Sequence, residues 1–313
     1  MKKLLFAILI CSTFSSQAQQ VDKQKVVNRL ADLMNRNYVF PEKGKEMHDL
    51  IKRNLQKGLY DEIDSPSALA AQLDKDLKSV QFDRHIRVRF SPSRAESMAN
   101  NRSPRESEGP KNYGFEKVEI LEGNIGYLDL RGFAGIGNAE EVAREAMDKL
   151  IQSDAIIFDL RQNGGGSPSM IRFISSYLFR DEPVHLNTFY WRPADRYEES
   201  WTNPADVSMH KPNIPVYVLT SNYTFSAAEE FTYNLKHMER ATVIGETTGG
   251  GAHPGGPMVI NQGFTVNVPQ GKAINPITKT NWEGKGISPH ISISADAALD
   301  KALDLARERL AKN

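Results

Sequence analysis

The sequence is poor in cysteine and carries no excess of either charge. One cysteine in 313 residues excludes a disulfide framework and a metal site built from several thiolates. Lys plus Arg and Asp plus Glu are equal at 39 each, whereas a chain that binds nucleic acid usually carries a basic excess. Proline and glycine, at 16 and 22 residues, are near average usage, so neither a fibrous nor a disordered chain is indicated. These features favour a globular protein with no nucleic-acid partner.

Long apolar runs are also rare, and the one that stands out lies at the N-terminus. Two lysines precede the apolar residues 4–10, and small residues follow at Ser16 and Ala18. This pattern is typical of a secretory signal peptide, whereas a membrane span needs about 20 apolar residues. We therefore expect residues 1–18 to be a signal peptide, and the mature chain to be periplasmic or secreted, with no membrane span after cleavage. Cleavage would remove Cys11, which excludes a thiol enzyme.

The first part of the expected mature chain has the pattern of helices. Apolar residues recur every three to four positions through residues 21–80, and Ser65 before a proline is typical of a helix start. Apolar and basic residues then alternate over residues 86–90, which is the period of a β-strand. We predict a small all-helical N-terminal domain at residues 19–90 and a polar linker at residues 91–115.

The rest of the chain alternates between strand-like and helix-like patterns. The clearest is the continuous apolar run at residues 155–160, which suits a strand buried in a parallel sheet. The expected strands are residues 118–121, 125–130, 155–160, 216–219 and 242–244, and the expected helices are residues 140–151, 168–178, a helix that begins near 226 and a helix near the C-terminus. This alternation predicts an α/β domain with a largely parallel sheet over residues 116–313.

Two of the buried strands end in turns that could carry chemistry. The first turn, residues 159–166, ends in three glycines, whose amides can face a ligand without hindrance from a Cβ. The second, residues 219–229, places Ser226 at the start of a helix, where unpaired amides and the helix dipole favour a negatively charged oxygen. Because such turns meet at one crevice in open α/β sheets, glycine amides and the amide of Ala227 could form an oxyanion hole for acyl transfer.

The residues alone leave the acting serine and histidine open. Ser226 could be a plain helix cap, and Ser167 and Ser169 compete with it as nucleophiles, although the proline between these two fits a helix start better. A serine nucleophile needs a base, and the seven histidines show no metal-binding spacing, so no metal site is predicted. His85, where the helical region meets a strand, and His253, in a glycine-rich loop, both remain candidates for the base.

Ordered motifs along the chain resemble the tail-specific (C-terminal processing) serine peptidases. They are Asp-Leu-Arg-x-Asn-x-Gly-Gly at residues 159–166, Phe-Ser-Ala-Ala-Glu at 225–229 and Gly-Glu-Thr-Thr-Gly-Gly at 245–250. The resemblance is closest to the branch that holds the tricorn protease and interphotoreceptor retinoid-binding protein, since residues 37–42 and 281–289 are also similar to the latter. The resemblance covers nearly the whole mature chain.

Carried over position by position, the resemblance implies a complete serine-peptidase site. Ser226 matches the nucleophile, and the amides of Gly165 (or a neighbouring glycine) and Ala227 match the oxyanion hole. His85 matches the general base, and Glu283 matches the acidic residue that supports it. The resemblance also implies a ClpP/crotonase-like α/β core and an exported serine endopeptidase. Its substrates would be peptides or proteins, and it would need no cofactor.

The chain departs from the family pattern at several positions. Gly251 stands where the Ser–Lys branch has its lysine, which favours His85 as the base. Arg84 stands where the tricorn-like branch has a serine directly before its histidine, and His290 stands where the family usually has an aspartate. Too few residues lie between Phe90 and the next expected strand for a PDZ domain, so none is predicted.

Two other functions stay open on the same fold. One is a module that binds a peptide or a hydrophobic ligand, such as a retinoid or a fatty acid, without useful hydrolysis. The other is an acyl-transfer enzyme that is not a peptidase, in which the glycine amides would matter more than Ser226.

Overall fold

The apolar run predicted as a buried strand forms β4 (Ala155–Asp159) at the centre of the main sheet. The computed structural model describes residues 21–100, 111–261 and 263–312, so the predicted signal peptide lies outside the described residues. The main sheet has the order β12–β8–β7–β4–β3–β2, in which neighbours are parallel except for the antiparallel pair β3 and β2. The other strands are β2 (Phe115–Leu121), β3 (Ile125–Leu130), β7 (Val216–Thr220), β8 (Thr242–Gly245) and β12 (Ile291–Ser292). The predicted α/β class with a largely parallel sheet is confirmed.

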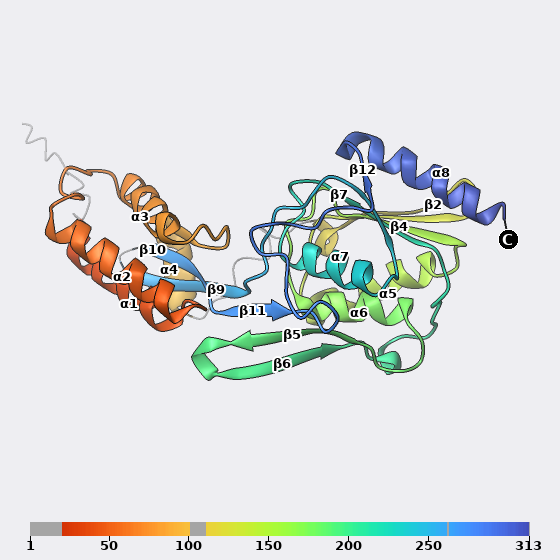
Figure 1. The fold of residues 1–313 in the computed structure, drawn as a ribbon, viewed down its shortest axis with the longest axis horizontal. Helices are drawn as coiled ribbons and strands as arrows, with labels where there is room; N and C mark the ends of the chain where they lie inside the picture. Colours follow the sequence, from red (N-terminus) through yellow and green to blue (C-terminus); the bar gives the residue numbers. More distant parts are fainter. Residues whose placement is uncertain (1–20, 101–110, 262, 313) are drawn as a thin grey trace, which may run out of the picture.

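Helices cover both faces of this sheet, which explains why its central strands β4 and β7 are buried along their whole length. Helices α5 (Ile136–Leu150), α6 (Pro168–Leu178) and α7 (Ala227–His237) pack against one face, where β4 contributes Ile156 and Phe158. Helix α8 (Ala298–Leu310) packs against the other face, where β4 contributes Ile157. Figure 1 shows α8 on one side of the sheet and α5, α6 and α7 on the other.

The helices predicted for the N-terminal region are present and confirm a helical part there. They are α1 (Lys23–Asn37), α2 (Pro41–Gln56) and α3 (Pro66–Val80), and the side chain of Ser65 caps α3 by accepting from the backbone N–H of Ala68. The sequence did not indicate that these helices pack on a small sheet of order β1–β10–β9. Its strands are β1 (Arg87–Phe90), β10 (Phe264–Pro269) and β9 (Gly255–Asn261). The N-terminal core is thus completed by a hairpin from residues 255–269.

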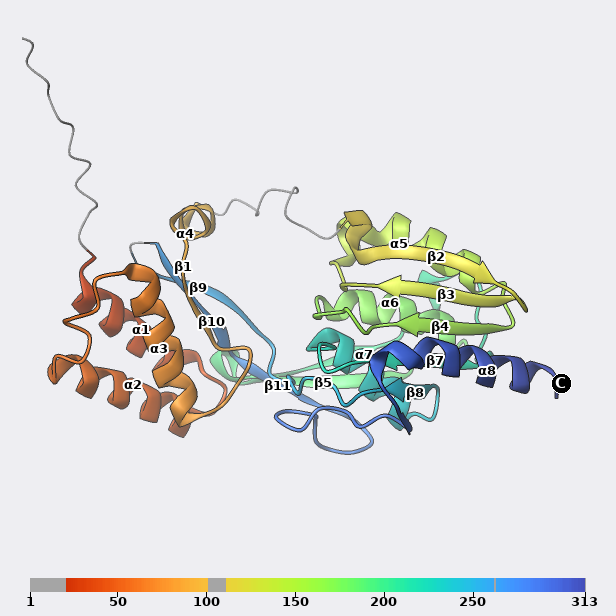
Figure 2. The same ribbon diagram turned by 90° about the horizontal axis from the view of Figure 1, so that it is seen from above.

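Further strands connect the two parts of the molecule. Strands β11 (Gly271–Ile274), β5 (His185–Trp191) and β6 (Arg196–Trp201) form an antiparallel sheet, which the sequence patterns did not predict. Figures 1 and 2 show the helices α1–α3 at one end of the molecule and the main sheet at the other, with β9 and β11 running between them.

The segment predicted as a linker is partly helical, since α4 (Pro92–Ala99) lies within it. This helix contacts β9 and β10 and therefore belongs to the N-terminal part. No helix in the described part of the chain combines the length and the apolar character needed to cross a bilayer.

Candidate active site

Ser226 lies in a strained turn between β7 and α7. Its φ of 56° and ψ of −119° are unusual for a residue with a Cβ, and such strain in folded proteins is concentrated at functional sites. Ser226 is the N-cap residue of α7, and its backbone N–H donates to Oε2 of Glu229 at 2.9 Å. Its hydroxyl oxygen lies 3.0 Å from Nε2 of His85. The structure therefore brings together the serine and the histidine on which the sequence prediction rests.

The carboxylate of Glu229 fixes the turn of Ser226 to the glycine-rich loop that follows β8. Besides the N–H of Ser226, it accepts from the hydroxyl of Thr248 at 2.5 Å and from the N–H groups of Gly250 and Gly251 at 2.7 and 2.8 Å. Burial raises the pKa of Glu229, while these hydrogen bonds to its charged form oppose the rise. Glu229 belongs to the Phe-Ser-Ala-Ala-Glu motif, but no sequence pattern indicated this role.

His85 comes from the N-terminal part, in the turn between α3 and β1. Its ring packs against that of Phe225, with 4.6 Å between the ring centroids. Burial lowers the pKa of His85 to about 4, and the negative charge of Asp83 opposes this change. The imidazole is therefore neutral at pH 7, the form that can accept a proton. Its Nδ1 is buried without a hydrogen-bond partner among the described residues, and the nearest carboxylate oxygen, Oδ1 of Asp83, is 3.8 Å away.

Asp83 is fully buried and connects His85 to the alternative base, His253. One carboxylate oxygen of Asp83 accepts from the backbone N–H of His85 at 2.9 Å. The other contacts Nδ1 of His253 at 2.9 Å and the hydroxyl of Tyr38 at 3.3 Å. His253 therefore lies behind Asp83, whereas His85 directly contacts Ser226. The sequence motifs assigned no role to Asp83, although its position two residues before His85 was a possible signal.

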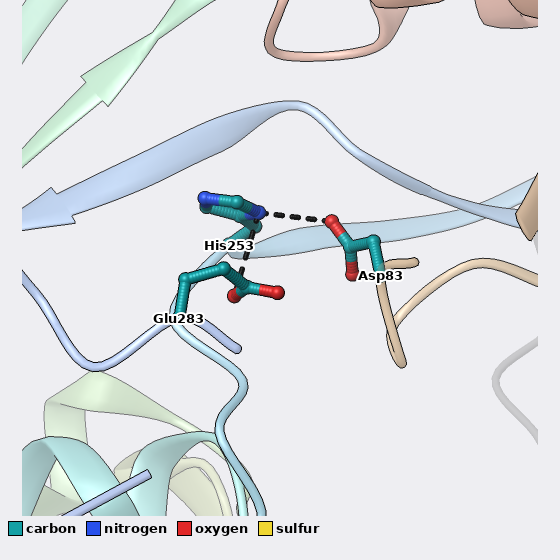
Figure 3. Close-up of side chains that lie close together, drawn as sticks. All are labelled: Asp83, His253 and Glu283. Carbon is teal, nitrogen blue, oxygen red and sulfur yellow. Dashed lines mark hydrogen bonds and ion pairs between the residues drawn. The ribbon is translucent and has the colours of Figure 1, made fainter. Parts of the chain in front are cut away.

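Glu283 lies beside His253 and not beside the serine. Figure 3 shows Asp83, His253 and Glu283 together, with Nδ1 of His253 3.4 Å from Oε2 of Glu283. The same oxygen accepts from the backbone N–H of Ala252 at 2.6 Å. Burial and the nearby charge of Asp83 raise the pKa of Glu283 to about 7. The polar atoms of the three residues lie within 4.8 Å of one another, close enough to share a cation, but Nδ1 of His253 already contacts both carboxylates and hydrogen-bonds to that of Asp83.

Contrary to the prediction, the amide of Gly165 is not free to act as an oxyanion donor. Its N–H donates to the side-chain oxygen of Asn163 at 2.9 Å, because that side chain folds back over the glycine turn. Gly165 instead allows close packing, since a Cβ there would lie 2.8 Å from Cβ of Ser226. The next residue, Gly166, lines the cavity beside Ser226 together with Ala227. Gly166 and Ala227 thus both border the space at Ser226.

This cavity beside Ser226 has a volume of about 280 Å³ and mostly apolar walls. Phe189, Trp191 and Trp282 line it, together with the buried side chain of Glu230. Burial raises the pKa of Glu230 to about 8, and its Oε1 has no hydrogen-bond partner among the described residues. A neutral carboxyl group with a free oxygen is suited to bind the polar end of a ligand side chain. The sequence patterns gave no indication of this residue.

Models of known protein families match the chain along most of its length. The model of peptidase family S41 matches residues 124–293, and the model of the N-terminal domain of peptidase S41 in eukaryotic IRBP matches residues 19–123. The tail-specific protease of Haemophilus influenzae is 29% identical over 138 residues, which are 44% of this chain and 18% of that protein. Carboxyl-terminal-processing peptidase 1, chloroplastic, of Arabidopsis thaliana is 30% identical over 210 residues, which are 66% of this chain and 40% of that protein. The match thus spans less than half the length of either curated relative.

Solved structures match the fold. A putative peptidase from Parabacteroides merdae has a TM-score of 0.64 at 21% identity, covering 91% of this chain and 96% of that one. The photosystem II D1 C-terminal processing protease has a TM-score of 0.59 at 15% identity, covering 92% and 97%. The tricorn protease has a TM-score of 0.57 at 15% identity, covering 91% of this chain and 37% of that one. The structural matches show the fold alone, and together with the family models they confirm the resemblance predicted from the sequence.

Replacing Glu230 by glutamine should stabilise the protein increasingly as the pH rises. The pKa of Glu230 is about 8 in the folded state against 4.5 ordinarily, so between these values the folded state binds more protons than the unfolded state. The free energy of unfolding of the unmodified protein then falls with pH, by up to about 5 kcal/mol over this window. Glu230→Gln removes this loss. Thermal unfolding at pH 5, 7 and 9 measures the difference between the two proteins.

The matched control is Glu141→Gln, which changes an exposed carboxylate on α5. Its stability relative to the unmodified protein should not vary with pH in this way. If the gain from Glu230→Gln were equal at pH 5 and pH 9, the raised pKa would be wrong.

Proposed function

Because the chain belongs to peptidase family S41, we propose that it is a serine peptidase in which Ser226 attacks the peptide bond and His85 is the base. The observation that carries this proposal is the 3.0 Å contact between Oγ of Ser226 and Nε2 of His85. This separation is within hydrogen-bond reach, as required of a nucleophile and its base. The position of Ser226 at the start of α7 adds amide donors where negative charge would develop.

The chemistry follows from these positions. Nε2 of His85 takes the hydroxyl proton while Oγ of Ser226 bonds to the carbonyl carbon. The imidazolium returns the proton to the leaving nitrogen as the C–N bond breaks, which leaves an acyl group on Ser226. A water molecule, deprotonated by His85, then attacks this acyl carbon, and the proton returns to Oγ as the acid is released. The low pKa of His85 keeps the ring available as a base in neutral solution.

The oxyanion of the intermediate would be held by the amides of Gly166 and Ala227. Both residues line the cavity at Ser226, and Ala227 is the first residue of α7, where backbone N–H groups have no helical partner. Fixed donors of this kind act without reorganisation during the reaction. Gly165 contributes by permitting the close approach of its turn to Ser226.

Asp83 and Glu283 would support His85 from behind. Once His85 is protonated, its Nδ1–H faces the carboxylate of Asp83, now 3.8 Å away, and the opposite charges attract. We propose that Glu283 acts through His253, whose Nδ1 contacts both carboxylates. The role proposed for Glu283 is therefore positioning, since its contacts are with His253 and Ala252.

Peptides or proteins are the substrates proposed for this site, and export is proposed from the pattern of residues 1–18. The apolar walls of the cavity, formed by Phe189, Trp191 and Trp282, also favour a second candidate function. In that alternative the cavity binds a peptide or a hydrophobic ligand, and Ser226 catalyses no hydrolysis. The alternative predicts saturable ligand binding without covalent labelling of Ser226.

A fluorophosphonate probe should label the unmodified protein and not Ser226→Ala. Ser226→Ala should also lower the rate of peptide hydrolysis by roughly 10⁴-fold or more, because the nucleophile is lost. His85→Ala should cause a loss of similar size. Ser167→Ala is the control, since the hydroxyl of Ser167 hydrogen-bonds to that of Ser169. Labelling that persists in Ser226→Ala but disappears in Ser167→Ala would contradict the assignment of the nucleophile.

Asp83→Asn should lower the rate and shift the acid limb of the pH profile of kcat/KM. The negative charge of Asp83 raises the pKa of His85, so its removal lowers that pKa further below about 4. The acid limb should then move to lower pH, while the rate falls by roughly 10²- to 10⁴-fold because the imidazolium loses its counter-charge. An acid limb near pH 6.5 in the unmodified enzyme, or one that moves upward in Asp83→Asn, would exclude this arrangement.

A further inference from the structure

A second cavity also borders His85, and arginine side chains line it. Its volume is about 390 Å³. Arg87 and Arg89 come from β1, where the intervening Val88 is buried in the N-terminal core and the two arginines are exposed. Arg94 comes from α4, and Arg84 directly precedes His85. The cavity thus lies between the outer face of the small sheet and the turns at the end of the main sheet.

Within the described part of the chain, no carboxylate balances the charges of this cavity. No acidic side chain lines it among the described residues, and no described carboxylate forms an ion pair with Arg87, Arg89 or Arg94. Arginines elsewhere do pair with carboxylates, namely Arg131, Arg144, Arg161, Arg196 and Arg307. Like charges gathered in one cavity repel each other and raise the local concentration of anions. A guanidinium group is also the side chain best suited to bind a carboxylate through two parallel hydrogen bonds.

The position of the cavity tells which part of a peptide would reach it. His85 lines both cavities, whereas Ser226 and Ala227 line only the apolar one. In the proposed reaction the oxyanion forms on the side of Ala227, and the leaving nitrogen takes its proton from His85. The arginine cavity therefore borders His85 but not Ser226, which favours the side where the leaving fragment departs. That fragment carries the residues that follow the cleaved bond.

We propose that this cavity is a subsite for acidic side chains of the peptide substrate, located after the bond that is cut. The inference rests on the proposed peptidase function, because that function defines the leaving side. Several arginines exceed what one terminal carboxylate can engage, so the cavity is matched to a stretch with more than one Asp or Glu. Arg84 donates to the carbonyl oxygen of Gly249 at 2.8 Å and lies over the ring of Phe225, so it also supports the wall of the cavity.

The test uses Ser226→Ala, which permits binding to be measured without cleavage. Fluorescent peptides share one sequence before the scissile bond, and the residues after it are acidic, their amide counterparts, or lysines. Fluorescence anisotropy at low salt should give the lowest Kd for the acidic peptide, by roughly 10-fold over the amide peptide. The preference should decline as salt is raised, because exposed charges are screened. Adding Arg87→Gln and Arg89→Gln should remove most of the preference.

The matched control adds Arg29→Gln and Arg53→Gln, which remove the same charge from exposed positions on α1 and α2 outside the cavity. This control should keep the preference for the acidic peptide.

Equal Kd values for acidic and amide peptides would overturn the subsite, even if the unmodified protein hydrolyses both. A preference that vanishes when the terminal carboxylate is amidated, or equally good competition by a single-stranded oligonucleotide, would also overturn it. Acidic preference in Ser226→Ala without hydrolysis by the unmodified protein would reject the peptidase function and keep the anionic subsite.

Discussion

The proposed site depends on the hydrogen bonds that the buried carboxylate of Asp83 accepts. It is fully buried, and a buried negative charge is stable only when donors surround it. Its donors are the hydroxyl of Tyr38, the backbone N–H of His85 and the ring of His253, which come from three distant segments of the chain. The end of α1, the turn before β1 and the loop before β9 must therefore converge on this one group. That convergence places the ring of His85 where it meets Ser226.

Whether the proposed base can be a histidine or a lysine depends on space as well as on charge. A Cβ on Gly251 would lie 2.2 Å from Cζ of Phe225 and 2.8 Å from Cε1 of His85, so a side chain there and the imidazole exclude each other. The loop cannot easily move to make room, because Glu229 binds the amide of Gly251 and the amide of Ser226 at once. Gly251, which stands in place of the lysine, is thus a steric requirement of Phe225 and of the imidazole packed on it. A lysine in that position would have to occupy the space of the ring.

The sequence predicted the elements that local patterns encode and missed those that depend on distant contacts. The apolar run of β4 and the start of α7 at Ser226 follow from nearby residues, and both were located. The pairing of β1 with β10 joins residues far apart in the chain, so no local period indicates it. The role of Gly165 was misassigned for a different reason: its amide is taken by the side chain of Asn163, only two residues earlier, and the sequence pattern does not show which group that side chain binds. Burial of Glu230 depends on walls contributed by β5 and the loop at Trp282, which the patterns did not place.

The division of the site between two parts of the molecule makes its integrity depend on the hairpin β9–β10. Ser226 belongs to the α/β part, whereas His85 belongs to the part formed by α1–α3 and the small sheet. The hairpin arises from the α/β part of the chain but packs in the helical core, and Asn267 of β10 donates to the carbonyl oxygen of His85 at 2.7 Å. A local opening of the helical part would therefore withdraw His85 from Ser226 while leaving the main sheet folded. Contacts made by β10 with the helices thus contribute to the geometry of the site although they lie outside it.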